Sequence, residues 1–278
     1  LSVINANPND RAYGSLIATL PVGFNNINAH HSEHRFHSSK QLFTNGFSGG
    51  RSFIFDLVEP TAPKLKANFT NMNEFTFPHS FERLPNGNVL ATFQTVGQEN
   101  KKEGGLVEID TEGEFVRSSI ASDPGVSDFI RPYSLAILPG IDRIVSTSAD
   151  MKEADHSNVV QIWSLSNLSL IKTIVLQPGP RGNEHLDPAE PRVLGDGKTV
   201  LISTFYCGLY KIDNLESNDP TAKWVYSFDF NQKYDCAIPV VNKNYWIQAV
   251  GSKTALISLD ISNPDKPKKV DQLNFKTG

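Results

Sequence analysis

Apolar residues either alternate with polar ones or gather in short runs along almost the whole chain. Typical runs occupy residues 15–20, 52–55, 88–93 and 200–205 and are rich in Leu, Ile, Val and Phe. Runs of this length predict β-strands. Turn-forming residues such as Pro85-Asn86-Gly87 separate them, and no long segment shows the apolar spacing of an amphipathic helix. The chain is therefore predicted to be all-β.

The predicted strands recur as a unit. Each later unit opens on a segment with a proline, and these prolines recur about every 50 residues, as expected for a repeat architecture; they are Pro78, Pro132, Pro191 and Pro239. Four strands per repeat of this length are typical of β-propeller blades. A β-sandwich would not require such regular units, so the propeller is favoured.

The repeat gives five whole blades, starting near residues 27, 76, 131, 189 and 237. Two N-terminal strands, at 1–6 and 13–20, are left over, and we expect them to be the outer strands of a sixth blade. Either the ring closes with five blades and an appended pair, or the native protein continues past Gly278. The second alternative is favoured. Residues 1–278 are then expected to form a single propeller domain.

Composition and charge narrow the class of protein. Hydrophobic residues make up 39% of the 278 residues, which excludes intrinsic disorder. The formal net charge is −4 and no basic block occurs, so no nucleic-acid partner is expected. No stretch reaches the roughly 18 apolar residues of a membrane span, and residues 1–20 do not show the pattern of a signal peptide. We expect a small-molecule partner, while the compartment and oligomeric state stay open.

Cysteine and asparagine residues leave two further questions open. Cys207 and Cys236 are the only cysteines, which excludes Cys-rich metal motifs and leaves a disulfide and two buried thiols as alternatives. The glycosylation sequons at Asn68 and Asn167 are no more than a chain so rich in Asn, Ser and Thr contains by chance. They do not decide the compartment.

Histidines stand out in the first repeat. Four of the seven occur within a few residues, and they are His30, His31, His34 and His37. His31, His79 and Tyr133 each lie ten residues before the next predicted strand of their own repeat. The first strand of each propeller blade lines the central channel, so these three side chains are expected to converge at one channel mouth. Convergent polar residues in such a place predict a binding or active site.

The residues around this mouth suggest a metal site. His30, His31 and His79 are expected to lie near Glu190, and neutral imidazoles suit copper, zinc and iron alike. The loop with Glu33, His34 and His37 is expected to fold over the same mouth. The alternative is that these histidines only satisfy buried hydrogen bonds and that Glu190 and Arg192 pair with each other. His156 and His185 lie in loops and receive no role.

Several motifs resemble the selenium-binding protein / methanethiol oxidase family. They are Ala29-His30-His31-Ser32, Gly50-Arg51-Ser52-Phe53-Ile54-Phe55-Asp56, Glu59-Pro60-Thr61-Ala62-Pro63-Lys64-Leu65, Pro78-His79-Ser80, Gly104-Gly105-Leu106-Val107-Glu108-Ile109-Asp110 and Asp260-Ile261-Ser262-Asn263-Pro264. The resemblance implies a β-propeller whose bacterial members are copper enzymes that oxidise methanethiol. By motif, His30, His31 and His79 match three metal-binding histidines. The family's Cys pair after the His-His motif is absent, and no histidine after His185 matches a further ligand.

Three hypotheses of function follow. The first is a metal-dependent, most directly copper-dependent, oxidase in which Glu190 or Tyr133 moves protons. The second is a metal-free acid–base dehydratase, cyclase or cycloaddition catalyst of secondary metabolism, using His31, His79, Tyr133 and Arg192. The third is a non-enzymatic interaction scaffold. We place the oxidase first.

Overall fold

The computed structural model describes residues 1–97, 102–126, 130–151, 156–229, 235–236 and 238–276. Almost all regular structure in this part of the chain is β-strand, which confirms the all-β prediction. The exceptions are three single 3-10 turns, η1 (Phe47–Gly49), η2 (Pro139–Ile141) and η3 (Gly251–Lys253). No helix among the described residues is long and apolar enough to cross a membrane.

Five antiparallel sheets follow one another along the chain, each built from consecutive strands. The first holds β3 (Ala29–Ser32), β4 (Gln41–Gly46), β5 (Arg51–Asp56) and β6 (Lys64–Phe69). The second holds β8 (Phe75–Arg83), β9 (Val89–Val96), β10 (Gly105–Ile109) and β11 (Phe115–Ile120), with the short β7 (Asn71–Met72) added at the edge of β8. The sequence pattern did not predict β7.

The remaining three sheets have four strands each. The third consists of β12 (Pro132–Leu138), β13 (Arg143–Ser148), β14 (Val159–Ser164) and β15 (Leu170–Val175). The fourth consists of β16 (Pro188–Val193), β17 (Val200–Thr204), β18 (Gly208–Asp213) and β19 (Thr221–Ser227). The fifth consists of β20 (Val240–Asn242), β21 (Tyr245–Val250), β22 (Ala255–Asp260) and β23 (Lys268–Asn274).

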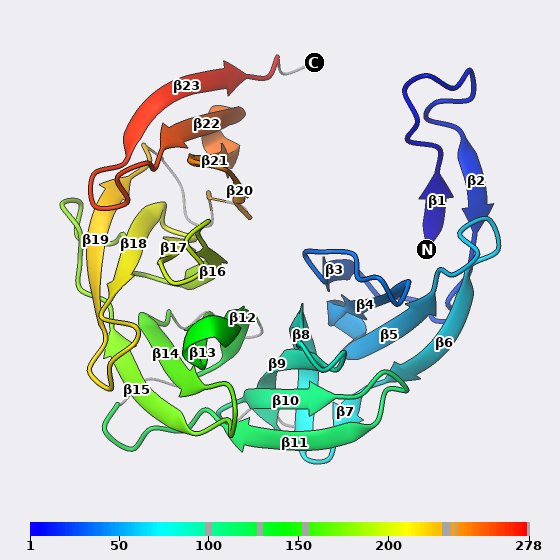
Figure 1. Cartoon of the computed structure of the whole chain (residues 1–278), viewed down its shortest axis with the longest axis horizontal. Helices are drawn as coiled ribbons and strands as arrows, with labels where there is room; N and C mark the ends of the chain where they lie inside the picture. Colours follow the sequence, from blue (N-terminus) through cyan, green and yellow to red (C-terminus); the bar gives the residue numbers. More distant parts are fainter. Residues whose placement is uncertain (98–101, 127–129, 152–155, 230–234, 237, 277–278) are drawn as a thin grey trace.

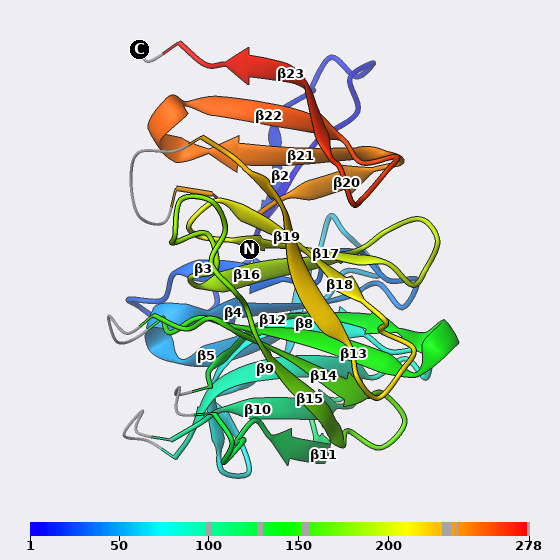
Figure 2. The same cartoon turned by 90° about the vertical axis from the view of Figure 1, so that its left-hand side faces the viewer.

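The five sheets stand radially around a common centre, as the blades of a β-propeller do (Figure 1). The first strand of each sheet lies innermost and the last lies at the periphery. Seen from the side, β12 and β16 run across the thickness of the ring (Figure 2). The residues at the beginnings and at the ends of the inner strands therefore face opposite sides of the molecule.

The two N-terminal strands form a sheet of their own. β1 (Ser2–Ile4) pairs with β2 (Leu16–Thr19) and, among the described residues, with no other strand. This hairpin occupies the sector between the first and fifth sheets, and an opening separates it from β23 (Figure 1).

Apolar packing between neighbouring sheets makes up the core. Phe43 and Ile54 of the first sheet pack with Phe81 and Phe93 of the second, and the same arrangement recurs between later sheets. Fully burying one such side chain contributes about 1.5–3 kcal/mol. Every residue of β14 is buried, because both faces of the third sheet are covered. In β22, by contrast, buried and half-buried residues alternate. This packing holds the inner strands, and the side chains they carry, in fixed positions.

A disulfide links the fourth and fifth sheets. Cys207, in the turn between β17 and β18, is bonded to Cys236, which precedes β20, and their Cα atoms are 5.2 Å apart. Of the two alternatives left open by the sequence, the structure therefore has the disulfide.

Candidate functional site

Three histidines meet where the inner strands begin. His30 and His31 lie on β3, and His79 lies on β8 of the neighbouring sheet. The ring centres of His31 and His79 are 4.4 Å apart, and that of His30 is 4.6 Å from His31 and 4.9 Å from His79. His31 and His79 are buried, whereas His30 is exposed. Within the described residues, this is the one group of His, Cys or carboxylate side chains close enough to bind a metal ion.

Tyr133, the third residue aligned by the ten-residue spacing, joins the same cluster from β12. Its ring centre is 4.2 Å from that of His79 and 5.3 Å from that of His31. Its hydroxyl lies 3.2 Å from Nε2 of His31. Burial raises the pKa of Tyr133 well above its usual value, so the hydroxyl keeps its proton and donates to His31.

The hydrogen bonds of His79 determine which of its nitrogens is free. Nδ1 lies 2.6 Å from the backbone carbonyl oxygen of Tyr133. A carbonyl oxygen can only accept, so Nδ1 carries a proton and donates it. Burial also holds the pKa of His79 well below its usual value, which keeps the ring neutral. The buried Nε2 then has an unshared electron pair and no hydrogen-bond partner among the described residues.

The donor set fits a transition-metal ion. Ligand atoms of His30, His31 and His79 all lie within 4.8 Å of one another. Nitrogens bound to one zinc ion at about 2.0 Å lie roughly 3.3 Å apart in tetrahedral geometry, so small side-chain movements would bring these into range. Burial lowers the pKa of His31 to about 4, and partial desolvation also lowers the pKa of the more exposed His30. With His79, all three rings are then neutral near pH 7, as metal ligands must be.

Glu190 is buried beside the histidines. Its Oε1 lies 3.8 Å from Nδ1 of His31, and its Oε2 accepts hydrogen bonds from Ser134 Oγ and from Arg192, each over 2.9 Å. Burial works to raise the pKa of Glu190, but neighbouring His34 and the Arg192 guanidinium outweigh it and lower the pKa to about 2. Glu190 and Arg192 thus do pair with each other, and Glu190 is ionised next to the cluster.

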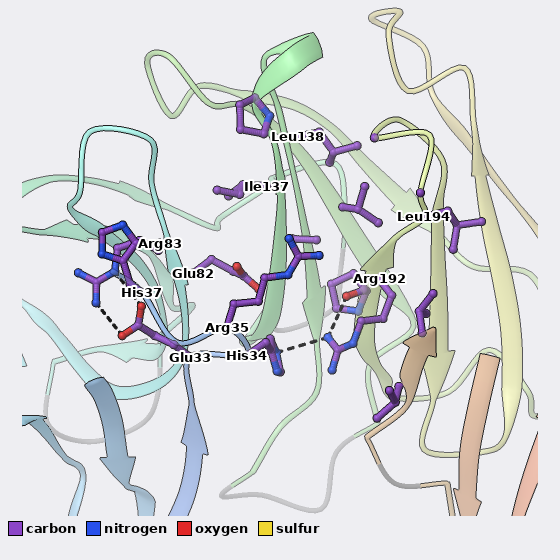
Figure 3. A pocket seen from close by; sticks show the side chains of 18 of the residues that line it. Glu33, His34, Arg35, His37, Glu82, Arg83, Ile137, Leu138, Arg192 and Leu194 are labelled. Atoms are coloured by element: carbon purple, nitrogen blue, oxygen red, sulfur yellow. Dashed lines mark hydrogen bonds and ion pairs between the residues drawn. The ribbon is translucent and has the colours of Figure 1, made fainter. Parts of the chain in front are cut away.

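A large cavity lies at the other end of the inner strands. It measures about 1050 Å³, and its lining begins where β3 ends, with Glu33 to Ser38, and includes Glu82 at the end of β8 and Arg192 at the end of β16 (Figure 3). The loop with Glu33, His34 and His37 was expected over the histidine mouth. It lines this cavity instead, because β3 carries the chain across the ring before the loop begins.

Three residues of this cavity received no role from the sequence. Glu82 lines the cavity, and burial raises the pKa of its carboxyl group. His34 lies 3.6 Å from the Glu190 carboxylate, and Arg35 extends from the same loop past Glu82 (Figure 3). The repeat could have identified Glu82, because Glu82 occupies the same position in its sheet as Arg192, which the sequence had selected. Glu82 pairs with Leu90 and Arg192 with Leu201, and each partner is the second residue of the following strand.

The other two histidines do not reach the cluster. His156 Nδ1 lies 2.7 Å from Asp187 and its Nε2 lies 3.1 Å from the Tyr206 hydroxyl. His185 is likewise not one of the three clustered histidines. Both remain without an assigned role.

Comparison with known proteins yields one sequence relative. No family model matches the chain. The sequence match is to a methanethiol oxidase. This Hyphomicrobium enzyme is 30% identical over 119 residues, which span 42% of the present chain and 27% of the oxidase. The matched segment is thus about a quarter of the relative's length.

Solved structures extend the likeness to the whole fold. A hypothetical selenium-binding protein from Sulfolobus tokodaii superimposes with a TM-score of 0.80 at 15% identity, covering 99% of this chain and 70% of the other. Virginiamycin B lyase from Staphylococcus aureus superimposes with a TM-score of 0.63 at 12% identity, covering 100% of this chain and 78% of the lyase. At these identities the likeness shows a common fold. Together with the partial sequence match, it supports a distant relationship to the selenium-binding protein / methanethiol oxidase family.

Proposed function

We propose that this protein is a metal-dependent oxidoreductase of a small molecule, a distant member of the selenium-binding protein / methanethiol oxidase family. The metal ligands are His30, His31 and His79. The observation that carries the proposal is the buried Nε2 of His79, whose electron pair has no partner among the described residues although the ring is fixed through Nδ1. A buried polar atom without a partner is costly, and a bound metal ion would satisfy it.

Among the metal ions that three imidazole ligands can bind, we favour copper. Zinc and iron accept the same ligands, and the likeness to a methanethiol oxidase favours a redox-active ion. A bound copper ion would supply one-electron chemistry toward dioxygen and the substrate. The ligand residues keep their nitrogens deprotonated for it, because burial lowers their pKa values.

Two neighbouring residues would donate and accept protons at this site. Tyr133 holds a proton on its hydroxyl, 3.2 Å from His31. Glu190 is an ionised carboxylate 3.8 Å from the same ring and can accept a proton. Arg192 keeps Glu190 charged and in position. These roles follow from the polarity of the groups and from their distances to His31.

Elemental analysis of protein purified without added metal tests the proposal. We expect about one equivalent of a transition metal per chain, or its recovery after reconstitution with Cu²⁺. Less than about 0.1 equivalent, with no gain on reconstitution, would rule out the metal site.

A metal-free acid–base catalyst, a dehydratase, cyclase or cycloaddition enzyme, is the second candidate. It is favoured by Glu82, a cavity carboxyl group whose raised pKa suits a general acid. Turnover that resists chelators and is lost in Glu82→Gln would support it. Full activity of a His31→Ala, His79→Ala double variant would exclude any catalytic role of the histidines.

We also propose that the radial array is a six-bladed β-propeller whose sixth blade has β1 and β2 as its outer strands. Three observations support this. The hairpin occupies the sixth sector, β1 lies on its inner side, and β22 of the adjacent sheet leaves alternate residues only half-buried (Figure 1). An experimental structure that places β1 and β2 on another sheet would contradict it.

A further inference from the structure

The cavity at the ends of the inner strands has the size of a site for a substantial organic molecule. Its volume of about 1050 Å³ is at the upper end of the range of ligand-binding cavities. Residues that follow or end the inner strands of four sheets line it, together with Ile238 to Val241 of the fifth. A one-carbon thiol such as methanethiol would occupy only a small part of this space.

One side of the cavity is apolar. Its lining includes Ile137, Leu138, Val193, Leu194, Ile238 and Val240. Ile238 and Val240 leave 44% and 59% of their surfaces exposed to solvent, so an apolar ligand would remove surface from water on binding.

Most charges on the polar side neutralise each other. The Glu33 carboxylate accepts two hydrogen bonds from Arg83, over 2.8 and 2.7 Å, and the Glu190 carboxylate accepts one from Arg192 over 2.9 Å. These pairs leave no net charge for a ligand.

Arg35 is the exception. Its guanidinium forms no hydrogen bond or ion pair with any residue that the structure describes, and Figure 3 shows it extending across the cavity between Glu82 and Arg192. Lys243 adds a second cation to the lining. The one acidic side chain left to oppose them is Glu82, so the unpaired charge of the cavity is positive.

We propose that this cavity binds an amphipathic organic anion, with its carboxylate on Arg35 and its apolar body against Ile137, Val193 and Val240. Arginine presents two parallel N–H donors that match a carboxylate. A neutral ligand of the same shape would desolvate the guanidinium without pairing it, which is costly. The inference goes beyond the proposed function by naming a ligand class for a second site, and it does not depend on the metal.

Isothermal titration calorimetry with matched acids and amides tests the proposal. The probes are 1-naphthaleneacetate and 4-phenylbutyrate, each with its uncharged primary amide, titrated into the full chain before and after removal of metal by a chelator. Only the acid can form a charge-assisted pair with Arg35, so we expect each acid to bind at least about tenfold more tightly than its amide.

Two variants locate the effect. Arg35→Gln should remove the preference for acid over amide and leave binding of the amide nearly unchanged. Arg11→Gln is the matched control, because Arg11 lies in the exposed loop between β1 and β2 and does not line the cavity. Circular dichroism melting of both variants verifies that they fold.

The proposal is overturned if wild-type protein binds none of the acids, if it binds acids and amides equally, or if Arg35→Gln keeps the preference. Metal content is measured on the same samples. Acid binding by protein that takes up no metal would support the cavity and contradict the metal site, so the two proposals fail separately.

Discussion

The backbone carbonyl oxygen of Tyr133 lies 2.6 Å from Nδ1 of His79. This contact joins the second and third sheets at the histidine cluster, and Thr92 donates a second hydrogen bond to the same oxygen over 2.9 Å. The carbonyl fixes both the orientation and the tautomer of His79, as partners of metal-binding histidines commonly do. It is the reason why Nε2 is the atom available to a ligand.

Loss of His79 should abolish tight metal binding. We expect His79→Ala to weaken Cu²⁺ affinity at least about 100-fold, since a removed ligand costs more than a removed second-sphere partner. Competition dialysis against a chelator of known affinity measures this. His37→Ala is the control, because His37 forms hydrogen bonds to Ser39 and lies outside the cluster. Equal affinities of the two variants would contradict the ligand assignment.

Tyr133→Phe should separate folding from metal binding. The variant loses the hydrogen bond to His31, which costs about 1 kcal/mol of folding free energy. Metal affinity should stay the same or increase, because the hydroxyl no longer occupies Nε2 of His31. Urea unfolding and metal titration measure the two quantities. A large loss of affinity would mean that Tyr133 itself is a ligand.

Arg192→Met should destabilise the protein strongly. It leaves the buried Glu190 carboxylate without its charged partner, and an unpaired buried charge costs about 3–5 kcal/mol. Glu190→Gln in the same chain should recover most of this loss, since the amide carries no charge. Denaturant unfolding of the four proteins in this cycle gives the coupling energy. Additive effects would show that the pair is not coupled.

Acid should destabilise the metal-free protein in two steps. The pKa of His31 is lowered from 6.5 to about 4, so the unfolded chain binds more protons between these values and stability falls as the pH drops from 6.5. The pKa of Glu190 is lowered from 4.5 to about 2, so its contribution is present above 4.5 and is lost as the pH falls toward 2. Unfolding free energies measured from pH 7 to 4 should decline less steeply in His31→Asn.

Reduction of the disulfide should cost stability through the unfolded state. Cys207 and Cys236 are 29 residues apart, and closing a loop of that length contributes about 3.5 kcal/mol. We expect a Cys207→Ala, Cys236→Ala variant to be less stable by about this amount and insensitive to reductant, unlike the wild type. Unfolding curves with and without dithiothreitol compare them. A wild-type protein unaffected by reductant would show that the bond does not form.

The sequence predicted the sheets well because each repeat contains its own turn signals and alternating strands. It missed β7, since two residues carry no recognisable pattern. At the site, the ten-residue spacing aligned His31 with His79 and Tyr133, but the strand pairing aligns His30 with these two residues instead. The same bulge separates Ala29 from Ser32, Pro78 from Phe81 and Pro132 from Leu135, so the counterparts of His31 are Ser80 and Ser134. His31 lies in the cluster all the same, with its ring centre 4.4 Å from that of His79.

The sequence could not place the cavity residues. Arg35 lies in a loop, and a loop has no periodicity from which its direction could be inferred. Whether Glu190 pairs with Arg192 was also open, since residues two apart on a strand share a face but need a bent side chain to meet. The buried Oε2 and its 2.9 Å contact decide that question.

The five sheets follow one another around the centre, and apolar side chains pack between neighbouring sheets. In such an array each sheet is stabilised by its immediate neighbours, and local opening begins where the fewest apolar side chains are buried. The third sheet, covered on both faces, should exchange its amide hydrogens slowest, and the fifth should open most readily. Because the disulfide crosses the boundary between the fourth and fifth sheets, it limits how far an opened fifth sheet can separate from the body that carries the histidines.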